Sequence, residues 1–147
     1  PDRGLHLASA GERGARQGPQ ARGADLVLPA QHGFHLQEPL PVRKHAVVET
    51  RHELRGQCFT GKVLVFPGAK GSSGWSAQFH VARVMGTGPA AWLFNQMTTK
   101  IALGAVVSHA PAMTDFDIDP LTVIQTGDWV RVDATAGIVT ITRKKIL

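Results

Sequence analysis

The sequence predicts an α/β domain with one mixed sheet, in which a parallel β-α-β core is followed by a C-terminal β-hairpin. A strand is expected over residues 62–66, because residues 63–66 form a continuous apolar run, which is typical of a strand buried on both faces of a parallel sheet. A Gly- and Ser-rich loop, a helical pattern and a second apolar run at 90–94 follow it in order. Near the C-terminal end, residues 129–132 and 138–142 alternate apolar and polar side chains on either side of a Gly-containing turn. That pattern predicts the hairpin.

The other elements of the core follow from local patterns. A helix is expected over residues 77–85, because apolar side chains recur at helical spacing and Gly86 stands where a C-cap glycine belongs. Residues 99–107 fit either a short helix or a strand, and residues 111–113 fit a short strand. Together these segments predict a second crossover after the first.

The amino-acid composition of the N-terminal part of the chain changes near residue 24. Residues 1–23 contain five glycines, few large apolar side chains and no periodicity, so we expect a flexible arm there. Residues 24–30 and 44–50 are short apolar runs that predict strands. Residues 24–147 are therefore expected to form the folded domain.

Composition excludes several classes of protein. The 147 residues are 43% hydrophobic, enough for the core of one domain, but no apolar run reaches the roughly 20 residues of a membrane span. The net charge is +5, yet seven of the 16 basic residues lie in residues 1–23 and 143–145. The middle of the chain is nearly balanced in charge and has no basic residues interleaved with aromatics, which argues against nucleic-acid binding. The one cysteine, Cys58, allows neither an internal disulfide nor a multi-cysteine metal site, and it fits a reducing cytoplasm.

The histidines and aspartates do not predict a metal site. The seven histidines are scattered, and His80, on the expected helix, is interpreted as a partly buried, hydrogen-bonded side chain rather than a catalytic base. Asp115, Asp117 and Asp119 lie within five residues, but the glycine and the distal glutamate of a calcium loop are missing. We interpret these aspartates as turn-forming residues.

The loop at residues 67–76 is the segment most indicative of function. It places three glycines and three serines between a buried strand and the start of a helix. Glycines let the backbone approach a ligand, and unpaired N–H groups at a helix N-terminus attract anions. Ser72 or Ser73 could direct its hydroxyl into a cleft at the carboxyl end of the strand. The spacing matches neither a phosphate-binding loop nor a dinucleotide fingerprint, and an ordinary capping turn remains the alternative.

Three segments of the sequence resemble the small swivel domain of the aconitase X family. They are RHELRGQCFTGKVLVFPGAKGSSGWS, GPAAWLFNQMTTKIALGAVVSHAPAMTDF and DPLTVIQTGDWVRVDATAGIVTI, and the resemblance covers residues 48–141. It implies a swivelling β/β/α domain that docks on a large subunit of the same enzyme. The iron–sulfur cluster is implied in that large subunit, and no cofactor is expected on this chain alone. The implied reaction is the dehydration of a small hydroxy acid, in the cytoplasm.

The same resemblance implies roles for four residues of the loop. Ser72 stands where the family presents its catalytic serine, so an acid/base role is implied for it, with Lys70, Gly71 and Ser73 as substrate-binding neighbours. Because serine is a weak base, its alkoxide needs stabilisation by loop N–H groups, by Lys70 or by the metal-bound substrate.

The family offers two substrates. Its members resemble either cis-3-hydroxy-L-proline dehydratases, which form Δ1-pyrroline-2-carboxylate, or mevalonate 5-phosphate dehydratases. The segments PGAKGSSGWS and LFNQMTT look closer to the hydroxyproline type, which predicts that substrate.

A second resemblance supplies a rival. The Gly-rich loop, the helix ending in Ala-Arg and the segment TGDWVRVDATAGIVTI also look like the mobile phosphohistidine domain of phosphoenolpyruvate-using enzymes. A Ser-His pair opens the helix in that family, whereas Ser76 and Ala77 stand here, so the histidine that takes the phosphoryl group is missing. The rival is therefore a non-catalytic domain that binds a ligand at the same loop.

Overall fold

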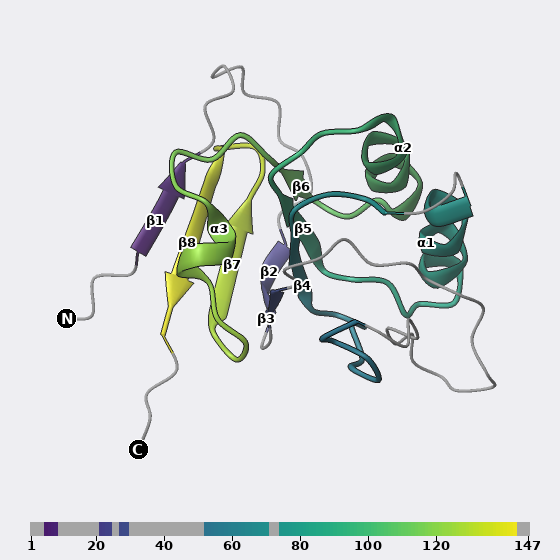
Figure 1. Ribbon diagram of the computed structural model, residues 1–147, viewed down its shortest axis with the longest axis horizontal. Helices are drawn as coiled ribbons and strands as arrows, with labels where there is room; N and C mark the ends of the chain where they lie inside the picture. The colour runs from purple at the N-terminus through teal and green to yellow at the C-terminus, as the bar shows by residue number, and fades with distance from the viewer. Residues whose placement is uncertain (1–4, 9–20, 25–26, 30–51, 71–73, 144–147) are drawn as a thin grey trace.

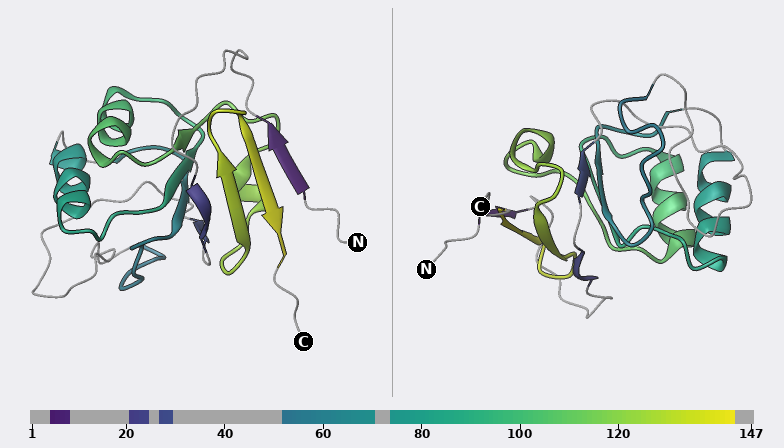
Figure 2. Two further views of the ribbon diagram at one scale, coloured as in Figure 1. Left: turned by 180° about the vertical axis from the view of Figure 1, so that it is seen from behind. Right: turned by 90° about the horizontal axis from the view of Figure 1, so that it is seen from below.

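The chain forms three layers: an antiparallel sheet, a parallel sheet and a pair of helices (Figure 1). The computed structural model describes residues 5–8, 21–24, 27–29, 52–70 and 74–143. The right-hand view of Figure 2 shows the parallel sheet between the antiparallel sheet and the helices α1 and α2. This layering confirms the predicted α/β class with its β/β/α arrangement.

The central layer is the parallel sheet. Its strands, in spatial order, are β3 (Val27–Pro29), β4 (Val63–Phe66), β5 (Ala91–Phe94) and β6 (Ala112–Met113). Every residue of β4 and β5 is buried, as predicted for strands covered on both faces. Helix α1 (Gly74–Val84) connects β4 to β5, and helix α2 (Thr99–Ser108) connects β5 to β6. The predicted crossover is confirmed.

The ends of the helices follow capping rules. Helix α1 is followed by Gly86, whose φ of 68° is the left-handed conformation expected of a C-cap glycine. Before α2, the Oγ1 atom of Thr98 accepts a hydrogen bond from the Ile101 N–H at 3.4 Å. The open choice for residues 99–107 is therefore settled as a helix. No helix in the described part of the chain has the length and apolar character needed to cross a membrane.

The antiparallel layer forms a sheet of its own. Its strands, in spatial order, are β1 (Leu5–Ala8), β8 (Ile138–Thr142), β7 (Trp129–Asp133) and β2 (Ala21–Ala24). The predicted hairpin is confirmed as β7 and β8, which pair antiparallel. The hairpin stacks on the parallel sheet instead of joining it, so the strands do not form one mixed sheet. An alternating hairpin has one apolar face, and Val130, Val132, Val139 and Ile141 bury that face against Val63 and Val65 of β4.

The prediction of a flexible arm over residues 1–23 is wrong for the segments that the structure describes. Strand β1 pairs with β8, and Leu7, opposite Val139, is fully buried in the core between the sheets. Strand β2 pairs with β7. The strand predicted within 24–30 is confirmed as β3, whereas the one predicted at 44–50 lies outside the described residues.

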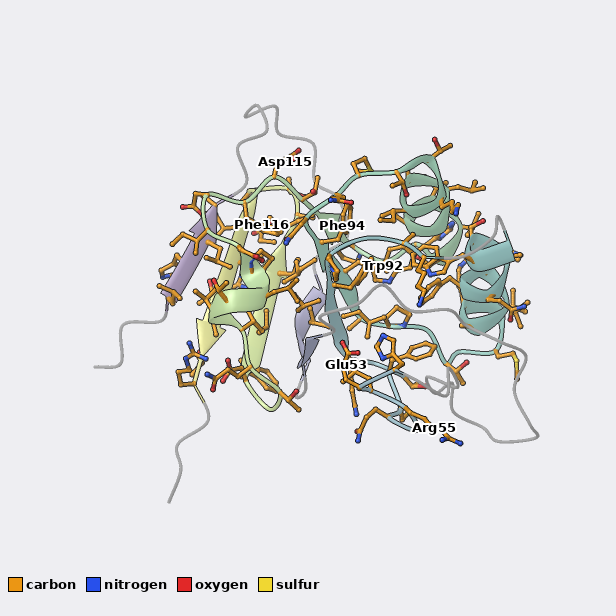
Figure 3. All side chains as sticks on the ribbon, viewed as in Figure 1. Glu53, Arg55, Trp92, Phe94, Asp115 and Phe116 are labelled. Atoms are coloured by element: carbon orange, nitrogen blue, oxygen red, sulfur yellow. The ribbon has the colours of Figure 1, made fainter. Side chains whose placement is uncertain are left out.

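Aromatic side chains fill the space between the parallel sheet and the helices. Figure 3 shows Trp92 directed from the sheet toward α1. The Trp92 ring lies 5.2 Å from Trp75 and 4.5 Å from Phe79 of α1, measured between ring centroids. Gly104 of α2 is buried against Trp92 and Trp75. The close approach of the α2 backbone to these rings explains a glycine in the middle of a helix.

We expect the substitution Asp128→Ala to lower the free energy of unfolding by about 1.5–3 kcal/mol. The Asp128 side chain is buried, and its Oδ2 atom accepts hydrogen bonds from the Gln125 N–H at 2.9 Å and from Arg143 Nη1 at 2.8 Å. Removing the carboxylate leaves the Gln125 N–H without this acceptor. Urea denaturation measures the loss. Asp133→Ala, which removes a more exposed turn carboxylate, is the control, and an equal loss in both variants would contradict the expectation.

Candidate functional site

Three loops meet at the edge of the parallel sheet where its strands end. The loops that follow β4, β5 and β6 begin with residues 67–70, 95–98 and 114–119. Figure 3 places Asp115 and Phe116 at this upper edge, whereas Glu53 and Arg55, which precede β4, lie at the lower edge. Ligands of parallel α/β sheets bind at the carboxyl edge, so this is the candidate site.

Of the four predicted site residues, the structure describes Lys70. It is exposed at the end of the segment that leaves β4, and α1 begins at Gly74. Ser72, with Gly71 and Ser73, lies outside the described residues. The loop therefore runs from the carboxyl edge of the sheet to a helix N-terminus, as expected, and the roles of its residues stay predictions.

The β4–α1 loop is joined to the β5–α2 loop through Gln96. The backbone N–H of Gln96 donates a hydrogen bond to the carbonyl oxygen of Pro67 at 2.9 Å. Gly68 also faces Gln96, because a Cβ atom added at Gly68 would lie 3.5 Å from Gln96 Oε1 and 3.6 Å from Gln96 Cβ. Two successive residues of the loop, Pro67 and Gly68, therefore lie against Gln96.

The neighbouring residue, Asn95, joins the β5–α2 loop to the segment after β6. Its Nδ2 atom donates to Oδ1 of Asp119 at 3.0 Å, and its carbonyl oxygen accepts from Thr114 Oγ1 at 3.4 Å. Asp119 Oδ1 also accepts from the Leu121 N–H at 2.9 Å, which caps the short helix α3 (Pro120–Val123). Asp119 is therefore a capping and turn-forming carboxylate, as predicted.

The other two aspartates of this segment also have local roles. Asp117 accepts from the Ala8 N–H at 3.3 Å and donates its own N–H to the Ala8 carbonyl at 3.2 Å, which ties the segment to β1. Asp115 adopts a left-handed backbone conformation with φ of 55°. Neither aspartate gathers with other acidic, histidine or cysteine side chains in the described residues, where no group of at least three such residues could hold a metal ion.

The other two candidate residues, His80 and Cys58, do not form a catalytic or metal-binding centre with the described residues. His80 is exposed on α1, which corrects the expectation that it is partly buried. Cys58 is the only cysteine of the sequence and is half-buried. An iron–sulfur cluster needs several thiolate ligands, so the residues of this chain do not fit such a cluster.

Reasoning from the sequence missed Asn95 and Gln96. The available signal was an amide pair directly after a fully apolar strand, at the end of the strand where ligands of parallel sheets bind. The partner of Asn95, Asp119, was interpreted only as a turn residue, because its distance from Asn95 is set by the tertiary fold.

Comparison with known proteins identifies the family. Residues 39–141 match the aconitase X swivel domain, and this match covers more than half of the chain. The chain belongs to the aconitase X family. Its matched region contains the whole candidate site, from β4 to α3.

Several similar proteins of curated function carry the same name. The chain is 37% identical to the phosphomevalonate dehydratase small subunit of Methanococcoides burtonii over 93 residues, which cover 63% of this chain and 68% of that protein. It is 38% identical to the protein of the same name from Methanocella arvoryzae, covering 63% of this chain and 70% of that protein. The chain is thus a hydro-lyase component of the small-subunit type.

Solved structures agree with the fold. The crystal structure of Thermococcus kodakaraensis aconitase X in its holo-form superposes with a TM-score of 0.78 at 27% identity, covering 95% of this chain and 100% of that chain. A UPF0107 protein solved by solution NMR superposes with a TM-score of 0.71 at 25% identity, over the same shares. The β/β/α swivel fold implied by the resemblance is confirmed.

Proposed function

We propose that this chain is the small subunit of a cytoplasmic aconitase X-type dehydratase that removes water from mevalonate 5-phosphate. The observation that carries the proposal is the shared name of the relatives from M. burtonii and M. arvoryzae, at 37% and 38% identity. The comparisons favour this substrate over the cis-3-hydroxy-L-proline predicted from the sequence. The amino-acid sequences of the loop segments PGAKGSSGWS and LFNQMTT still favour cis-3-hydroxy-L-proline, which is therefore the second candidate substrate.

The proposed active site is shared between two chains. As a small subunit, this chain would supply the loop at residues 67–76 to a large subunit that binds most of the substrate. The chain's own donors do not fit an iron–sulfur cluster, so we assign the cluster of the family to the large subunit. The carboxyl edge of β4, β5 and β6 then faces the substrate, because the loop leaves from that edge.

Dehydration needs a base and a leaving group. A proton leaves one carbon of the substrate, a hydroxyl group leaves the neighbouring carbon, and a double bond and water form. We assign the proton removal to the Ser72 side chain in its alkoxide form, which takes the proton and becomes a hydroxyl. Two features support this assignment: the loop ends at the N-terminus of α1, whose partial positive charge favours an anion, and Lys70 adds a positive charge two residues from Ser72.

A comparison of two substrates tests the proposed function. The complex with its large subunit, prepared anaerobically, is assayed on mevalonate 5-phosphate and on cis-3-hydroxy-L-proline under the same conditions. We expect kcat/KM to be at least about 100-fold higher for mevalonate 5-phosphate, since a site built for a phosphate group leaves charged donors unpaired with any other substrate. The reverse preference would select the hydroxyproline reaction instead. Turnover of neither substrate by an intact complex would reject both.

A further inference from the structure

The strongest unassigned feature of the carboxyl edge is a junction of hydrogen bonds at the Asn95-Gln96 dipeptide. Gln96 holds Pro67 of the β4–α1 loop, and Asn95 holds Asp119 and Thr114 from the segment after β6. The two residues are adjacent in sequence, so we expect a shift of one contact to displace the other. Three loops are thereby fixed relative to one another by one dipeptide.

We infer that the Asn95-Gln96 dipeptide is a positioning element. It holds the start of the β4–α1 loop in the position, relative to the two neighbouring loops, that the function of the loop requires. The inference rests on the proposed function, in which that loop acts on the substrate. Neither residue is assigned a contact with the substrate. Their effect is indirect, through Pro67 and Gly68, the residues that begin the loop.

The chemistry of the Asn95–Asp119 pair allows a specific test. Asn95 Nδ2 is the donor and Asp119 Oδ1 is the acceptor, at 3.0 Å. In Asn95→Asp, two carboxylates meet and the donor is lost, so the contact becomes repulsive. In Asp119→Asn, an amide oxygen still accepts from Asn95 and still caps α3, because asparagine is a good N-cap residue. Exchanging both residues restores one donor and one acceptor.

The structural arm of the experiment uses the full chain without its partner. Backbone amide chemical shifts of Gly68, Ala69 and Lys70 are compared between the wild type and the variants. We expect clear shifts in Asn95→Asp, near-native positions in Asp119→Asn, and recovery in the double exchange. Asp133→Asn removes one negative charge at the turn between β7 and β8, as Asp119→Asn does before α3, and should leave these amides unmoved. Asn95→Ala, which removes the donor without adding a charge, serves if Asn95→Asp does not fold.

The functional arm uses the complex with the large subunit. We expect kcat to fall about 10- to 100-fold in Asn95→Asp with KM nearly unchanged, since small displacements of catalytic groups cost this much in rate. The double exchange should recover most of kcat. Unchanged amide shifts in both Asn95 variants, or moved shifts with an unchanged kcat, would overturn the inference. If no complex turns over either substrate while the amides respond as expected, the proposed function fails and the loop coupling stands.

Discussion

Replacing Ser72 with alanine is expected to lower kcat of the complex by about 100- to 10,000-fold, the usual contribution of a positioned acid/base group. The expectation rests on the proposed role of Ser72, which the resemblance implies, and on a loop that connects the end of β4 to the N-terminus of α1. The variant should bind the large subunit as tightly as the wild type, because removing one hydroxyl changes little surface. Steady-state kinetics and a binding titration measure the two effects.

Two other serine variants serve as controls, because they show whether the loss of activity is specific to Ser72. Ser73→Ala, in the adjacent position, should lower kcat less than Ser72→Ala. Ser108→Ala removes a hydroxyl that bonds to the Ala105 carbonyl near the end of α2, at the opposite end of that helix from the candidate site, and should leave kcat unchanged. Full dehydratase activity in the Ser72→Ala complex would show that the base is another residue.

Gly104→Ala is expected to destabilise the fold by about 1–3 kcal/mol, the usual cost of overpacking a core. Alanine is normally favoured over glycine inside a helix by about 1 kcal/mol, so helix propensity alone predicts the opposite sign. A Cβ atom at position 104 would lie 2.7 Å from the Trp92 ring and 2.8 Å from the Trp75 ring. Both rings are buried, so they have little room to retreat.

Urea denaturation of the full chain measures this effect. Ala102→Ser, at an exposed position of the same helix, should change the free energy of unfolding by less than about 0.5 kcal/mol. Combining Gly104→Ala with Trp92→Leu removes the nearest ring atoms, so the double variant should lose less stability than the two single losses added together. A Gly104→Ala protein as stable as the wild type would contradict the packing described for α2.

The sequence was most informative about the central layer. The apolar runs at β4 and β5 and the capping glycine at position 86 are local signals, and local signals predict strands and helix ends well. Helix α2 was ambiguous, because its residues are apolar on most sides and the cap supplied by Thr98 was not recognised. The separate antiparallel sheet was missed because β1 and β2 pair with β8 and β7, which are more than 100 residues away in the sequence. Leu7 is buried by a partner more than 130 residues away, Val139.

The sequence predicted where the candidate site lies in the fold, but not the hydrogen bonds that hold its loops together. A Gly- and Ser-rich segment after a buried strand points to the carboxyl edge, and the structure describes Lys70 as an exposed residue in the segment that leaves β4. The contacts of Asn95 and Gln96 depend on how three loops converge, which no local pattern encodes. The sequence of this chain does not determine the substrate either. The loop segments look closer to the hydroxyproline dehydratases of the family, whereas the similar proteins are named phosphomevalonate dehydratase small subunits.

The proposed role of this chain is to complete an active site on a larger partner. Its most direct test is a titration of the chain into the purified large subunit, followed by the rate of dehydration of mevalonate 5-phosphate under anaerobic conditions. We predict no turnover by either component alone and a rate that rises to a plateau at one chain per large subunit. Full activity of the large subunit without this chain, or no association between the two, would contradict the claim.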